Sequence, residues 1–169
     1  MEISLFTKCL FEFIGTLVLV LLGDGVVAST VLKRSKGFDG GWIVITIAWG
    51  LAVMCGVLIA GPYSGAHLNP AVSVGLAVAG SFPLAYVPGY VAAQLLGGFF
   101  GAVVVYLYYK DHFDATDDPA AKLGVFCTMP AIMDKPRNLF CEVVGTFLLV
   151  FVILALGNEQ NTPEIGMGS

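Results

Sequence analysis

Charged residues are scarce in this 169-residue chain, and they are absent from its middle. Only 12% of the residues are Asp, Glu, Lys or Arg, against the roughly 25% that is usual in soluble domains. Residues 41–108 contain none of these four types, while 57% of the chain is hydrophobic and its mean hydropathy is +0.88. A soluble protein that exposed the surface of such a stretch would aggregate. The composition therefore predicts a protein whose solvent is mostly lipid.

Several motifs are also lacking, and each absence narrows the function. The four cysteines form no Cys-x-x-Cys pair and accompany no histidine cluster, so we expect no disulfide, metal or redox role for Cys9, Cys55, Cys127 or Cys141. No nucleophile–base pair, metal-ligand cluster or phosphate-binding loop is visible, and we expect no catalytic residue and no cofactor. The N-terminus lacks a signal-peptide pattern, because acidic Glu2 comes early and no small-residue cleavage site follows a short apolar core. We therefore expect the first apolar segment to remain as a membrane span. The expected partner of the protein is the lipid bilayer, and we expect no binding of nucleic acid.

Four segments are long and apolar enough to cross a bilayer, which requires about 20 residues of helix. We expect these spans near residues 9–32, 42–60, 83–109 and 139–156. A polar turn at residues 33–37 joins the first two spans. A polar loop at residues 111–138 joins the last two, and we expect its His112 and its Asp cluster to be solvated. The fold class predicted from this pattern is all-α and transmembrane.

The connection between the second and third spans is apolar but irregular. Residues 61–65 read Gly-Pro-Tyr-Ser-Gly, and we expect them to interrupt the helix. Asn69 and Pro70 then predict a helix start, because Asn is a strong N-cap and Pro suits the first helical position. This helix should run to about Ala79, which is about ten residues and half a bilayer. Irregular backbone at membrane depth is tolerated only where it is buried in protein or lines an aqueous cavity, so we predict a re-entrant loop followed by a half-helix.

The fourth span repeats the first. The pattern Glu-x-x-Gly-Thr occurs at residues 12–16 and again at residues 142–146, and a carboxyl group inside a membrane is costly and rare. Because three spans precede the second copy, that copy must cross the bilayer in the opposite direction. We expect residues 1–110 to form a first repeat, residues 111–138 a connecting loop and residues 139–169 the start of a second repeat. A second complete repeat would need a protein of roughly 250 residues, so we expect this chain to be part of a longer one.

Residues 64–72 read Ser-Gly-Ala-His-Leu-Asn-Pro-Ala-Val, and they resemble the pore signature of the aquaporin and glycerol-facilitator family. The resemblance extends over nearly the whole chain, because the signature lies in a re-entrant loop between two Glu-x-x-Gly-Thr spans. It implies an aquaporin-like inverted-repeat helical bundle, with a second Asn-Pro-Ala near position 199 followed by an arginine. Trp49 lies 20 residues before Asn69, where glycerol facilitators place an aromatic residue in the narrowest filter. The sequence looks most like the glycerol-conducting branch from Gram-positive bacteria.

The resemblance also implies roles for individual residues. Asn69 would cap the half-helix and donate its free amide N–H to solutes, and the half-helix dipole would repel cations and protons. Backbone carbonyls of the loop would form a ladder of acceptors at Gly65, Ala66, His67 and Leu68. Trp49 would face the carbon side of a polyol. The residues that would support the loop structurally are Glu12, Gln94, Pro70, Ala71 and Glu142.

Simpler interpretations remain open for several of these residues. Trp49 is also consistent with an interfacial anchor, and His67 with a histidine that bonds only loop backbone. A role for Glu12 and Glu142 in proton relay is less favoured than loop support. Gly97 and Gly101 form a Gly-x-x-x-Gly pattern, which predicts close packing of the third span.

The function implied by the resemblance is a passive channel for glycerol, small neutral polyols and water that excludes ions and protons. The protein would be a multi-pass homotetramer of the cell membrane, with one pore in each subunit and no enzyme activity. Three alternatives remain: a water-selective aquaporin, a secondary transporter and a non-conducting membrane scaffold. A transporter normally needs ionisable residues at its substrate site, where this loop offers only His67.

Charge alone does not settle the orientation. Lys8 lies on one side of the predicted membrane and the other seven Lys and Arg residues lie on the opposite side. The positive-inside rule would therefore place the N-terminus outside. The family places it in the cytoplasm, and we follow the family.

Overall fold

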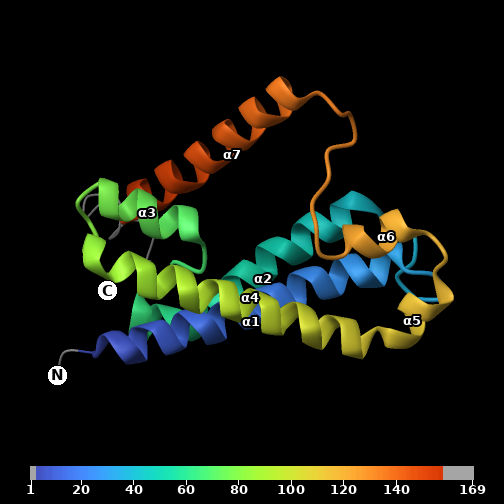
Figure 1. Cartoon of the computed structure of the whole chain (residues 1–169), viewed down its shortest axis with the longest axis horizontal. Helices are drawn as coiled ribbons and strands as arrows, with labels where there is room; N and C mark the ends of the chain where they lie inside the picture. The colour runs from blue at the N-terminus through green and yellow to red at the C-terminus, as the bar shows by residue number, and fades with distance from the viewer. Residues whose placement is uncertain (1–2, 158–169) are drawn as a thin grey trace. The chain divides into compact units, whose positions relative to one another are not determined.

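The structure is a computed structural model that describes residues 3–157, and every regular element in that range is a helix. The described residues divide into two compact units, residues 3–70 with 88–129 and residues 71–87 with 130–157. The first unit contains α1 (Leu5–Val31), α2 (Gly41–Ser64), α5 (Lys110–Ala115), α6 (Pro119–Gly124) and all but the first residue of α4 (Val87–Tyr108) (Figure 1). The second contains the 3-10 helix η1 (Leu84–Tyr86), α7 (Lys135–Leu156) and all but the first residue of α3 (Pro70–Val78). The predicted all-α fold is confirmed.

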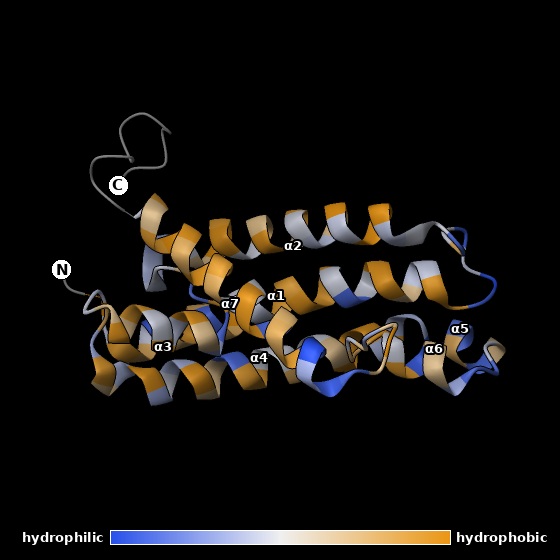
Figure 2. Ribbon diagram, turned by 90° about the horizontal axis from the view of Figure 1, so that it is seen from above, coloured by the Kyte–Doolittle hydropathy of each residue, from blue (hydrophilic) through white to orange (hydrophobic). Residues whose placement is uncertain are grey.

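Four helical segments within residues 3–157 are long and apolar enough to span a membrane. They are Leu5–Val31, Gly41–Ser64, Leu84–Tyr108 and Lys135–Leu156, in agreement with the four predicted spans to within a few residues. Hydrophobic residues cover much of these helices in Figure 2, and many large ones are exposed, among them Ile43, Ile47 and Leu58 on α2. Exposed apolar side chains on long helices are typical of a lipid-facing surface. The chain is therefore a multi-pass membrane protein.

The second span continues further than the sequence indicated. The prediction that residues 61–65 interrupt the helix is wrong for residues 61–64, because α2 runs through Pro62 to Ser64. Proline removes one backbone donor without ending this helix. The end comes at Gly65, which has a φ of +84° and donates its N–H to Gly61 O at 3.1 Å, a glycine C-cap. The irregular connection is therefore only residues 65–69, here called the 65–69 loop, and α3 begins directly after it.

Two glycines of α4 allow a close approach to α1. A Cβ atom at Gly97 would lie 2.4 Å from the carbonyl oxygen of Phe13, and one at Gly101 would lie 2.7 Å from that of Leu17. Both obstacles are backbone atoms, so no side-chain movement would relieve the clash. A Cβ atom at Gly98 would instead meet its nearest neighbour at 3.8 Å. The close packing predicted from the Gly-x-x-x-Gly pattern is confirmed.

The polar loop after α4 is more ordered than the sequence predicted. It contains the short helices α5 and α6. Phe113 of α5 and Val125, which follows α6, are buried against Ala28, Leu32 and Val105 of the first unit. This small apolar cluster ties the loop to the ends of α1 and α4. The loop folds back onto the helices because it contributes hydrophobic residues of its own. These were not noticed in the sequence because the segment is rich in Asp.

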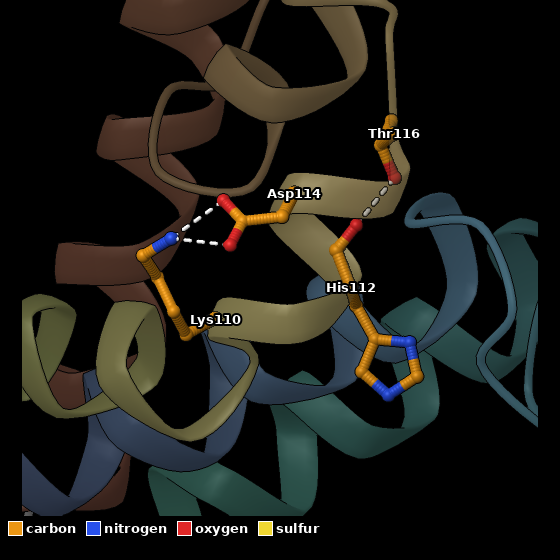
Figure 3. A network of polar contacts seen from close by, with 4 residues as sticks. All are labelled: Lys110, His112, Asp114 and Thr116. Carbon is orange, nitrogen blue, oxygen red and sulfur yellow. Dashed lines mark hydrogen bonds and ion pairs between the residues drawn. The ribbon is translucent and has the colours of Figure 1, made fainter.

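Polar contacts join the same loop to Lys33, two residues after the end of α1. The hydroxyl of Thr116 accepts the N–H of Lys33 at 2.9 Å and donates to the carbonyl of His112 at 2.7 Å, the second contact being drawn in Figure 3. His112 Nδ1 lies 3.1 Å from the carbonyl oxygen of Lys33, so the expectation that His112 is only solvated was wrong. Lys110 donates to both carboxylate oxygens of Asp114 (Figure 3), and this hydrogen bonding raises the pKa of the lysine above its ordinary value.

The Gly97 contact predicts a sharp difference between neighbouring glycines. Gly97→Ala in the intact protein should lower the free energy of unfolding by about 1–3 kcal/mol, because the new methyl group collides with α1 backbone. Gly98→Ala is the matched control and should leave stability nearly unchanged. Thermal unfolding in detergent measures both, and equal melting temperatures for the two variants would contradict the packing described here.

Candidate functional site

A fully buried carboxylate on α1 organises the polar interior of the first unit. Glu12 is 0% exposed and accepts four hydrogen bonds. Its Oε1 accepts from the Ser64 hydroxyl at 2.6 Å and from the His67 N–H at 2.9 Å. Its Oε2 accepts from the Leu68 N–H at 2.7 Å and from Gln94 Nε2 at 2.8 Å. The carboxylate thus connects α1 to the end of α2, to the 65–69 loop and to α4, and its charge is compensated by donors.

The 65–69 loop has an unusual backbone that these bonds hold in place. Ala66 and Leu68 have φ values of +50° and +53°, in a region that costs a non-glycine residue roughly 1–2 kcal/mol. Gly65 adopts its φ of +84° without that penalty. The N–H of Ala66 donates to the Ser64 hydroxyl at 3.1 Å, and the next two N–H groups donate to Glu12. The loop is therefore held from one side, through three consecutive amides.

The same three amides determine where the loop carbonyls point. In a planar trans peptide the carbonyl points opposite to the N–H, and the described chain has no cis peptide bond. The carbonyls of Gly65, Ala66 and His67 must therefore point away from Ser64 and Glu12. Among residues 3–157, the carbonyls of Gly65 and Ala66 accept no hydrogen bond. The loop thus presents a row of backbone acceptors on the face opposite to the carboxylate.

Two side chains of the loop pack against the neighbouring helices. The methyl groups of Leu68 lie between α1 and α2, where a Cβ atom at Gly15 or Gly56 would come within 2.6 Å or 2.8 Å of them. The glycine of the first Glu-x-x-Gly-Thr pattern is therefore needed to admit Leu68. The His67 ring lies 4.9 Å from the ring of Tyr90, and the buried Tyr90 hydroxyl donates to the Ser64 carbonyl at 2.7 Å.

Trp49 lies at a different level of the first unit. It precedes Ser64 by 15 residues on α2, or about 22 Å along the helix. Its six-membered ring rests on Gly23 of α1, where a Cβ atom would lie 2.6–2.7 Å from three ring carbons. Trp49 lines a cavity of about 790 Å³ together with Asp24 and Thr46. The predicted residues of the 65–69 loop do not line this cavity, so the site is extended along α1 and α2 rather than gathered at one point.

The structure tests the roles predicted for the remaining residues less directly. Asn69 and Pro70 are half-buried, α3 begins at Pro70, and Ala71 is its second residue. The side-chain cap expected from Asn69 stays a prediction. Glu142 is exposed on α7 and makes no hydrogen bond with the described residues, so its loop-holding role also stays a prediction.

Three residues of this region were missed from the sequence. Ser64 and Tyr90 complete the hydrogen-bond network around Glu12, and neither carries a sequence signal that separates it from other polar residues in apolar spans. Asp24 lines the cavity beside Trp49. Its signal was available, because an acidic residue inside an apolar span is rare.

Comparisons with known proteins found a matching family and several relatives. The family described as "Major intrinsic protein" matches residues 1–167. The "Probable glycerol uptake facilitator protein" of Thermotoga maritima is 55% identical over 151 residues, which are 89% of this chain and 64% of that protein. The "Glycerol uptake facilitator protein" of Bacillus subtilis is 51% identical over 154 residues, 91% of this chain and 56% of that protein. The chain thus spans less than two thirds of the length of either relative.

A solved structure matches the fold. The X-ray structure of the aquaglyceroporin from Plasmodium falciparum superposes with a TM-score of 0.63 at 39% sequence identity. The match covers 69% of this chain and 48% of that one.

The Glu12 network predicts a severe effect for a nearly isosteric change. Glu12→Gln replaces one acceptor oxygen by a donor, which leaves loop or side-chain donors unpaired at a cost of about 1–3 kcal/mol each. The melting temperature should fall, and the amides of residues 66–68 should exchange with deuterium faster. Asp114→Asn makes the same chemical change in an exposed ion pair and should alter stability by less than about 1 kcal/mol. Unchanged amide exchange in Glu12→Gln would show that the carboxylate does not hold the loop.

Proposed function

This chain belongs to the major intrinsic protein family, and on that premise we propose that the intact protein is a passive channel for glycerol, other small neutral polyols and water. The observation that carries the proposal is the row of loop carbonyls turned away from Glu12. The relatives named as glycerol uptake facilitators support the choice of solute. The amides of Ala66, His67 and Leu68 donate toward Ser64 and Glu12, so the carbonyls of the same peptide groups point to the opposite face.

The 65–69 loop would act by replacing the hydration of a neutral solute. Hydroxyl groups of water or glycerol donate to the carbonyls of Gly65, Ala66 and His67, and the Asn69 amide donates in return. The nine-residue helix α3 starts directly after Asn69, so the positive end of its dipole lies at the same point of the chain. Cations and protons would be repelled there, whereas neutral solutes would pass.

Trp49 would supply the apolar wall. Its ring is seated flat on Gly23, which restricts its orientation, and an aromatic face packs well against the C–H groups of a polyol. The solute would therefore pass with its hydroxyl groups toward polar groups and its carbon chain toward the indole. Water has no carbon chain, so its passage requires only the polar groups.

The proposal also covers the repeat organisation of the chain and the oligomeric state of the intact protein. Residues 1–110 would form the first repeat, residues 111–138 a connection and residues 139–169 the start of a second, inverted repeat. Glu142 would hold the second loop as Glu12 holds the first. The intact protein would be a homotetramer with one pore per subunit, without enzyme activity.

Flux through proteoliposomes tests the function. Vesicles containing the intact protein should take up glycerol along its gradient faster than empty vesicles, without saturation and independently of voltage. A requirement for an ion gradient would indicate a secondary transporter. Water flux without glycerol flux would indicate a water-selective channel, and the absence of both would favour a scaffold.

Two neighbouring glycines test the role of Trp49. Gly23→Ala should displace the indole, because the new methyl group lies within 2.6–2.7 Å of its ring carbons, and it should change the ratio of glycerol to water permeability by about two- to ten-fold. Gly25→Ala is the control, since a Cβ atom there meets nothing within 4 Å. An unchanged ratio in Gly23→Ala, with a stable protein, would remove Trp49 from the selective part of the pathway.

A further inference from the structure

Asp24 is a second buried carboxylate on α1, and its surroundings are the opposite of those of Glu12. It lies 12 residues further along α1, or about 18 Å, and only 8% of its surface is exposed. Within residues 3–157 it accepts no hydrogen bond and forms no ion pair. A carboxylate without a partner at this depth of a membrane span is costly, and a hydrogen-bond donor that enters the space beside it would offset this cost.

That space is the cavity of about 790 Å³ that Asp24 shares with Trp49. Its volume exceeds by far the roughly 30 Å³ that one water molecule takes up in the liquid, so it has room for water and a small organic solute. The polar lining also includes the hydroxyl residues Thr30 of α1, Thr46 of α2 and Thr128. Among the described residues, the charged side chains that line the cavity are Asp24 and Asp39.

The chemistry of the lining narrows the ligand class. Two carboxylates without a lysine or arginine do not favour an anion. Divalent cations prefer several oxygen ligands, and the described residues contain no group of three or more His, Cys, Asp or Glu side chains that could hold a metal ion. A neutral molecule with hydroxyl donors and a C–H face fits both the carboxylate and the indole.

We propose that Asp24 is the hydroxyl-binding residue of a polyol subsite in this cavity, with Trp49 as its apolar wall. The inference rests on the proposed channel function and adds a residue to it. The Asp24 carboxylate accepts hydrogen bonds from two adjacent hydroxyl groups of one solute, while the indole covers the carbon chain. Gly23 and Asp24 are adjacent on α1, so the glycine that seats Trp49 also brings the carboxylate to the same cavity. Water passes with little dependence on Asp24, because it has no carbon face to orient.

The test compares solutes in proteoliposomes with the intact protein. Asp24→Leu removes both hydrogen bonds and should lower glycerol permeability by at least about ten-fold, the equivalent of one charge-assisted hydrogen bond, while water permeability changes by less than about two-fold. Asp24→Asn keeps the shape and part of the acceptor capacity and should lie between Asp24→Leu and the wild type. Propane-1,3-diol lacks the middle hydroxyl, so its permeability should fall less than that of glycerol in Asp24→Leu. Asp111→Asn changes an exposed carboxylate that does not line the cavity; it is the matched control and should behave as the wild type.

The outcomes separate the two proposals. A wild-type protein that carries no glycerol overturns the channel function and the subsite with it. Wild-type glycerol flux that is unchanged in Asp24→Leu, or that falls equally for water and glycerol, overturns only the subsite. Size-exclusion chromatography and thermal unfolding accompany each variant. If Asp24→Asn and Asp24→Leu both fail to fold, Asp24 is a structural partner of another part of the protein, and the subsite is overturned.

Discussion

The hydrogen bonds accepted by Glu12 are the interaction on which the rest of this site depends. They connect residues as far apart as Glu12 and Gln94, which are 82 positions apart in the sequence. Burying a carboxylate is expensive unless its oxygens are satisfied, and here four donors from three elements satisfy them. Two of those donors are consecutive loop amides, so the charge also stabilises the left-handed conformations of Ala66 and Leu68. The outward direction of the loop carbonyls follows from this single anchoring.

Glycine is the second constraint, because it decides how close the helices come. Lipid offers little hydrophobic drive between helices, so packing depends on close van der Waals contact. Gly97 and Gly101 bring α4 against the backbone of α1, Gly15 admits Leu68, and Gly23 seats the Trp49 ring. These contacts have different consequences. The contact at Gly97 and Gly101 holds two spans together, the one at Gly15 anchors the loop, and the one at Gly23 orients an aromatic side chain.

The helix α1 carries two carboxylates that show how context assigns a role to the same chemical group. Glu12 is enclosed by donors and is structural, whereas Asp24 faces a cavity without a protein partner among the described residues. Both are costly at membrane depth. The first cost is offset within the fold, and in the proposed subsite a solute that enters the cavity offsets the second. This contrast is visible only once α2 is placed beside α1.

The sequence by itself determined the four spans, the half-helix start at Pro70 and the importance of Glu12, because hydropathy, capping residues and rare intramembrane charges are local signals. It also placed Trp49 and the loop in a family pattern. Only the tertiary structure decided that α2 continues through Pro62, that Leu68 packs between helices, that Ser64 and Tyr90 join the Glu12 network, and that Asp24 lines the cavity beside Trp49. These features depend on distances between residues far apart in the chain. Such distances follow from how helices approach one another, and no window of neighbouring residues encodes them.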